Sequence, residues 1–212
     1  MISEILSVIQ FFVKIYISMK LSANEILNKF SKNTTHPFEV KKLALMLFDE
    51  TSSKIHEMKP KYRDYLEAAA LLHDIGYHID AKGHNKHSMK MVLEHGLAEF
   101  SEQETKIIAC VCRYHRGSLP NKEEHEIYNT FDKKERKIVK RLAGILKIAD
   151  GLEKGHLNLI KELHINYDEQ TKVAEIILTP NISEYLPDIT DAIRKRDLYE
   201  IAFKCQTILK FI

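Results

Sequence analysis

The segment from Tyr65 to Gly76, which reads YLEAAALLHDIG, constrains the fold of this chain more than any other part of it. It carries scarcely a polar side chain before its last positions, and a helix that is apolar all round is buried on most of its sides. We expect Gly76 to end this helix. A buried helix needs other helices around it, and 212 residues are enough for one compact domain with such a core.

His73 and Asp74 stand at the end of this apolar segment. Burying even a neutral polar group without a partner costs about 2–7 kcal/mol, so these two side chains need compensation. A divalent metal ion would satisfy both, because it binds a neutral imidazole nitrogen and an anionic oxygen. A hydrogen bond between the two side chains, or a helix cap, would also satisfy them, and the dipeptide alone does not decide between these interpretations.

Apolar residues recur at intervals of three and four along most of the first 150 residues, which is the spacing of one face of an α-helix. Two helix starts are marked by capping boxes, at 101–104 and 132–135. Pro37 suits the first turn of another helix. We therefore predict helices over 22–32, 36–48, 65–76, 88–95, 101–112 and 132–149.

The pattern changes after Gly155. The segment ELHINYDEQTKVAEIIL alternates apolar and polar residues on both sides of a polar turn, which is typical of a β-hairpin. We expect one more helix over 188–205 and a third strand in the tail TILKFI. The sequence thus predicts a mainly α protein, with an amphipathic helix over 1–20, a helical core over 21–155 and a small α+β subdomain over 156–212.

The first twenty residues are the one candidate for a targeting segment. Glu4 stands where a secretory signal carries basic residues, and Gln10 and Lys14 interrupt the apolar run. We therefore expect no membrane-spanning segment. The broad apolar face would pack either on its own domain or on a second subunit of a homodimer, and the sequence favours neither arrangement.

Composition narrows the function classes. Lys and Arg number 32 against 30 Asp and Glu, so any basic site has to be local, and no specific nucleic-acid partner is indicated. The seven glycines form neither GxGxxG nor GxxxxGK, which excludes phosphate loops of those types. Cys110, Cys112 and Cys205 fit neither a CxxC motif nor an even disulfide framework, and we expect reduced thiols in a cytoplasmic protein.

Asp150 strengthens the metal interpretation. It follows Leu146 by four residues and so lies on the apolar face of the long helix. A carboxylate on a core face is rarely left unpaired. His36, at the start of the second predicted helix, is a further ligand of the right type.

The order His36, His73–Asp74, Asp150 resembles that of the HD superfamily of metal-dependent phosphohydrolases. The segments LEAAALLHDIGYHIDAKGHNKHS, RYHRGSLP and LAGILKIADGL are similar to the C-terminal HD domain of the exopolyphosphatase/guanosine pentaphosphate phosphatase (Ppx/GppA) family. The likeness runs from about Leu21 to the C-terminus and is most specific in the middle segment. It implies an HD-domain helical core and a primary metal site made of His36, His73, Asp74 and Asp150.

Related two-metal HD enzymes add two further histidines. The resemblance places His87 and His115 in these positions, with His84 as the competitor of His87. Mixed His/Asp ligation favours Mn, Fe, Ni or Zn over Mg.

The resemblance also implies roles in the reaction. Asp74, His115 and Arg116 would be catalytic, and Lys86, Arg113 and Arg116 would bind phosphate. For the three basic residues, plain surface charge is the alternative.

The full-length relatives carry actin-like N-terminal domains that perform the exopolyphosphatase reaction, and only about twenty residues precede the matching region here. We therefore do not carry over that activity. We expect instead a metal-dependent phosphohydrolase that acts on a nucleotide or another phosphorylated compound. The alternatives are a regulatory module that binds guanosine polyphosphate or polyphosphate without turnover, and a purely structural dimerisation domain.

Overall fold

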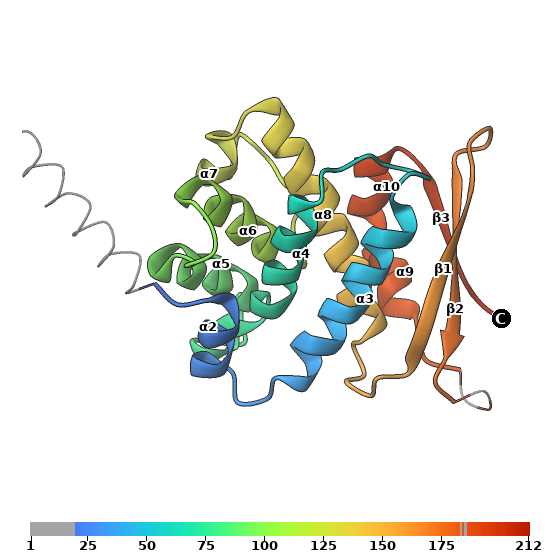
Figure 1. Cartoon of the computed structure of the whole chain (residues 1–212), viewed down its shortest axis with the longest axis horizontal. Helices are drawn as coiled ribbons and strands as arrows, with labels where there is room; N and C mark the ends of the chain where they lie inside the picture. Colours follow the sequence, from blue (N-terminus) through green and yellow to red (C-terminus); the bar gives the residue numbers. More distant parts are fainter. Residues whose placement is uncertain (1–19, 183, 185) are drawn as a thin grey trace, which may run out of the picture.

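The computed structural model describes residues 20–182, 184 and 186–212 (Figure 1). The predictions made for the N-terminal helix lie outside the described residues. In the described part of the chain, no helix combines the length and the apolarity that crossing a membrane requires. The elements are α2 (Ala23–Phe30), α3 (Thr35–Thr51), α4 (Lys61–Leu72), the 3₁₀ helix η1 (Ile75–His78), α5 (His84–His95), α6 (Glu102–Tyr114), α7 (Glu126–Asn129), α8 (Lys133–Leu152), β1 (Ile160–Asp168), β2 (Val173–Pro180), α9 (Thr190–Lys195), α10 (Asp197–Phe203) and β3 (Gln206–Phe211).

Capping boxes begin three of these helices. The Ser101 side chain caps α6 and the Asp132 side chain caps α8, each accepting the backbone N–H of a glutamate three residues later, as the sequence predicts. Ser22 begins α2 in the same way. Each cap satisfies backbone donors that a helix start leaves without a partner, and is worth about 1 kcal/mol.

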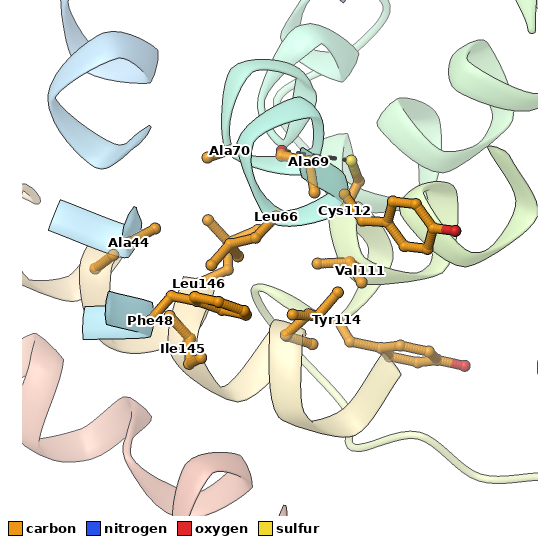
Figure 2. Packing of buried hydrophobic residues seen from close by; sticks show 14 of the residues in the cluster. Ala44, Phe48, Leu66, Ala69, Ala70, Val111, Cys112, Tyr114, Ile145 and Leu146 are labelled. Atoms are coloured by element: carbon orange, nitrogen blue, oxygen red, sulfur yellow. Dashed lines mark hydrogen bonds between the residues drawn. The ribbon is translucent and has the colours of Figure 1, made fainter. Parts of the chain in front are cut away.

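The hydrophobic core lies where α3, α4, α6 and α8 meet. Figure 2 shows side chains of all four helices converging there, with Phe48, Leu66, Val111 and Leu146 among them. The helix α4 packs on α2, α3, α6 and α8, which explains why its sequence is apolar on nearly every side. The prediction of a buried helix at the centre of a mainly α fold is therefore confirmed.

A three-stranded sheet in the order β1-β2-β3 stands at the end of the molecule that carries the C-terminus (Figure 1). The predicted hairpin and third strand are both present, and β1 packs on α3. Strand β3 runs parallel to β2, which requires a crossover connection. The crossover contains α9 and α10, and both helices pack on α8.

Three local predictions were wrong. Gly76 does not end α4, which stops at Leu72; Gly76 lies inside η1, where an added Cβ would stand 2.0 Å from the carbonyl oxygen of His84. The helix α5 begins at His84, one turn before the predicted start at 88, and its first two residues, His84 and Asn85, are polar but buried. The helix predicted over 188–205 is divided into α9 and α10 at Arg196.

Candidate metal centre

Several helix ends meet beside the core and bring imidazole and carboxylate groups together. Asp74 and Asp150 provide the carboxylates, and every histidine of the group is at most 5% exposed. Two of the helices begin there and three end there, so the negative ends of three helix dipoles favour a cation at this point. The group consists of His36 at the start of α3, His73 and Asp74 after α4, His84 at the start of α5, His115 after α6 and Asp150 in the last turn of α8.

Asp74 lies between two pairs of imidazoles. Its Oδ2 is 3.7 Å from Nε2 of His36 and 3.5 Å from Nε2 of His73. Its Oδ1 is 3.3 Å from Nε2 of His84 and 3.5 Å from Nε2 of His115. One carboxylate therefore offers one oxygen to each pair.

Asp150 joins the first pair. Its Oδ1 is 3.4 Å from Nε2 of His36 and 3.7 Å from Nε2 of His73. Its Oδ2 accepts a hydrogen bond from Nζ of Lys195 at 2.7 Å.

The backbone fixes the tautomer of three of these histidines. Nδ1 of His73, His84 and His115 donates to the carbonyl oxygen three residues earlier, at 2.7, 3.1 and 2.7 Å respectively. Because Nδ1 carries the proton, Nε2 of each neutral ring is left with a free lone pair. A hydrogen bond from the second ring nitrogen to a carbonyl oxygen is the usual way to orient a metal-binding histidine.

These residues fit divalent metal. Nε2 of His84 and Nε2 of His115 face each other at 3.4 Å, and with both protons on Nδ1 neither ring can donate to the other, whereas a cation could bind both lone pairs. Nε2 of His73 is buried and has no hydrogen-bond partner among the described residues. In each of two groups, His36–His73–Asp74 and Asp74–His84–His115, the ligand atoms lie within 4.8 Å of one another. Asp74 belongs to both groups, which suits a pair of ions.

The two carboxylates stay ionised at neutral pH. Burial alone raises the pKa of Asp74, but the charges of His73 and His115 outweigh it and lower the pKa below its ordinary value. Burial acts against Asp150 too, yet the contacts of its Oδ1 with His36 and His73 hold the pKa well below the ordinary value.

His73 and His115 shift in opposite directions. Burial lowers the pKa of His73, but the charges of Asp74 and Asp150 raise it to about 9. Burial, and then the charge of His73, lowers the pKa of His115 to about 4. The carboxylates thus draw positive charge to Nε2 of His73, where a proton and a metal ion would compete.

Two cavities open onto the cluster. One has a volume of about 320 Å³ and is lined by cluster residues together with Arg116, Lys154, Arg194 and Lys195. The other has a volume of about 580 Å³ and shares His36 and Asp74 with the first. Such volumes are those of small-molecule sites.

The structure brings most of the predicted site residues together, but it places His84 in the cluster where the sequence analysis favoured His87. His87 is half-buried on α5 and takes no part in either ligand group. Because α5 begins at His84, that ring points toward Asp74 from the first turn, next to Gly76 of η1.

Two of the three predicted phosphate-binding residues lie elsewhere. Arg116 lines the smaller cavity, but Lys86 is exposed and lines neither cavity. Arg113 is buried with its guanidinium 5.7 Å from the centre of the Tyr114 ring, and its carbonyl oxygen accepts a hydrogen bond from Asn85. The helix α6 therefore directs Arg113 into the protein interior, and Arg116, which follows the helix, lines the cavity at the cluster.

The sequence analysis missed residues of the loop after α8, of η1 and of the C-terminal crossover. The ring of His156, in the loop after α8, stacks on the ring of His36 with 3.9 Å between the ring centres. The backbone of His156 has a left-handed conformation, with φ of 55°. Tyr77 stacks on His84 at 4.1 Å. The i, i+4 spacing of Asp191 and Lys195 was the one sequence signal for the crossover residues, and it indicated only a surface ion pair.

Comparison with known proteins shows the family of the chain. A family model described as Ppx/GppA phosphatase, domain III, matches residues 19–191, which include every residue of the cluster. A search of curated proteins found no match. Because the match covers most of the chain, the protein belongs to the Ppx/GppA phosphatase domain III family.

Proposed function

We propose that this protein is a metal-dependent phosphohydrolase of the HD type that acts on a nucleotide or another phosphorylated compound. The observation that carries the proposal is Asp74, whose two oxygens each face the Nε2 atoms of a pair of imidazoles. A divalent ion of the Mn, Fe, Ni or Zn type would supply a water molecule with a pKa lowered to about 7, which is a nucleophile at neutral pH.

The surrounding residues suit a phosphate group. Arg116 and Lys154 line the cavity and can neutralise charge that develops on phosphoryl oxygens. The starts of α3 and α5 direct backbone N–H groups and the positive ends of two helix dipoles to the same place. The chain thus offers ligands for cations and donors for an anion in one small cavity.

The test is metal content and turnover together. Protein purified without chelator should contain a transition metal and hydrolyse a phosphoester or phosphoanhydride from a panel that includes guanosine polyphosphates. Asp74→Ala should lose both metal and turnover. Arg116→Ala should keep the metal and lose turnover by about 10²–10³-fold, the usual effect of removing one charge-stabilising donor. Metal content unchanged in folded Asp74→Ala would refute the proposal.

The second candidate is a binding module for a polyphosphate chain, and a separate groove favours it. A cavity of about 870 Å³ between the loop after α6, the first half of α8 and the end of α10 shares no lining residue with the two cavities of the cluster. None of its lysines forms an ion pair with another described residue. The basic residues of this groove are Lys122, Lys133, Arg136, Lys137, Lys140 and Lys204.

Two of these lysines have the same charge and lie close together on α8. Lys133 and Lys137 are an i, i+4 pair of like charge in the first turns of α8, where the helix dipole is also positive. Direct binding of long-chain polyphosphate by the metal-free protein would support this candidate. Binding should weaken in Lys137→Glu and Lys140→Glu and remain in Asp74→Ala. Equal binding by all of these variants would exclude the groove.

A further inference from the structure

Lys195 is an enclosed cation beside the cluster. Its side chain is 17% exposed, and Nζ lies 2.7 Å from Oδ2 of Asp150 and 2.7 Å from Oδ2 of Asp191. A flexible lysine side chain held between two carboxylates gives up most of its rotamer freedom. Such an arrangement fixes the carboxylates as firmly as it fixes the lysine.

Close packing of the α8 and α9 backbones places Lys195 at this position. Gly151 of α8 packs directly against α9, since an added Cβ would stand 2.6 Å from Cα of Ala192. Lys195 lies one turn later on α9, close to Asp150 on α8. It also lies beyond residue 191, where the match to the family model ends.

Asp191 holds Lys195 from the other side. It is 9% exposed, and it also accepts bonds from Lys154 at 3.3 Å and from Arg194. Asp191 thus gathers three cations, of which Lys195 alone reaches a residue of the cluster.

Because of the hydrogen bond from Lys195, the two oxygens of Asp150 have different partners. Oδ1 faces His36 and His73, and Oδ2 faces Lys195. A carboxylate with both oxygens free can bind one ion through both of them, and would then fill a position that a catalytic site leaves for water.

We propose that Lys195, held by Asp191, is a positioning residue that restricts Asp150 to one oxygen on the metal side and so keeps a position open for water. This inference rests on the proposed metal-dependent function. It assigns a role to the C-terminal crossover, which would complete a site otherwise built by the helical core.

The experiment compares four variants of the full chain loaded with Mn²⁺. Lys195→Met removes the hydrogen bond, Lys195→Arg preserves a donor, and Asp191→Asn loosens Lys195 without touching Asp150. The matched control is Arg196→Gln, because Arg196 follows Lys195, pairs with Glu200 at 3.3 Å and lines neither cavity. Bound Mn²⁺, thermal stability and the relaxation rate of water protons are measured for each.

Lys195→Met should bind as much Mn²⁺ as wild type, while the relaxation enhancement caused by exchanging water falls. Its kcat should fall about 10–100-fold, the usual effect of losing an outer contact to a metal ligand, with a smaller change in KM. Lys195→Arg should recover most of the relaxation enhancement, Asp191→Asn should be intermediate, and Arg196→Gln should match wild type.

If folded Lys195→Met shows the same water-proton relaxation and the same kcat as wild type, the inference is overturned. Loss of Mn²⁺ from the folded variant would also overturn it. If Lys195→Met does not fold, Asp191→Asn decides in the same way. Absence of Mn²⁺ from wild type itself would refute the proposed function, whereas a result confined to the variants bears on Lys195 alone.

Discussion

Asp74 belongs to both ligand groups of the cluster, whereas the sequence indicates it only as one ligand among several. Its Oδ2 faces His36 and His73, and its Oδ1 faces His84 and His115, so its loss should dismantle both halves of the cluster. Loss of one histidine should affect only one half.

Two of the histidines of α5, His84 and His87, test this division. His84→Ala should remove about half of the bound metal, because the second group then retains only Asp74 and His115. His87→Ala is the matched control, since His87 lies on the same helix outside both groups. Elemental analysis of the two variants measures the difference. Equal metal loss in both variants would contradict the placement of α5.

A buried histidine away from the cluster predicts a pH dependence of stability. His56 is 4% exposed, and its Nδ1 accepts the backbone N–H of Met58 at 3.2 Å. Burial, and then the charge of Arg141, lowers the pKa of His56 to about 4 from an ordinary value of 6.5. Protonation of Nδ1 would break the bond with Met58, so the folded state favours the neutral ring.

The sign of the effect follows from linkage. Above pH 6.5 His56 is neutral in both the folded and the unfolded state, so it does not reduce the stability of the fold. As the pH falls from 6.5 to about 4, the unfolded chain binds a proton at His56 before the folded chain does, and the fold loses stability. Thermal melts in chelator at pH 7 and pH 5 should therefore show a larger drop for wild type than for His56→Gln. An identical drop in both proteins would exclude His56 as a source of the pH dependence.

Among the elements, η1 decides which histidine joins the cluster. It packs on the start of α5 so closely that only glycine fits at position 76, and this contact fixes His84 beside Asp74. Sequence periodicity does not show such a contact, because it reports faces of single helices and not the approach of two backbones.

Gly76→Ala should therefore destabilise the fold by about 1–3 kcal/mol and weaken metal binding at the His84–His115 pair. The added Cβ would stand 2.0 Å from the His84 carbonyl oxygen, which has to move. Gly155→Ala is the control, because its nearest neighbour would be a Leu157 side-chain atom at 3.7 Å. Thermal unfolding and metal titration of both variants provide the measurement. A Gly76→Ala protein with wild-type stability would contradict the close contact.

At the scale of the whole molecule, the cluster ties together five helices that the core already packs. An ion bound to it should stabilise the folded chain by mass action, by about 2.7 kcal/mol when Mn²⁺ is present at 100 times its dissociation constant. Thermal melts with Mn²⁺ and with chelator should differ for wild type and coincide for Asp74→Ala. A stabilisation that persists in this variant would place the ion elsewhere.

The predictable part of this molecule is its helical core. The apolar segment before His73 and the position of Asp150 on the face of α8 indicate both the fold and part of the cluster. The positions of Lys195 and His156 depend on a crossover and a loop, whose paths follow from tertiary packing. Local sequence patterns cannot report them.

The position of α9 after the helical core also sets an order of events during synthesis. The chain emerges from the ribosome N-terminus first, so His36, His73 and His115 are exposed before α9 has been made. Lys195 can reach Asp150 only after α9 has been made and has packed on α8. An ion captured by a nascent chain before that point would therefore meet an Asp150 whose two oxygens are both free of Lys195.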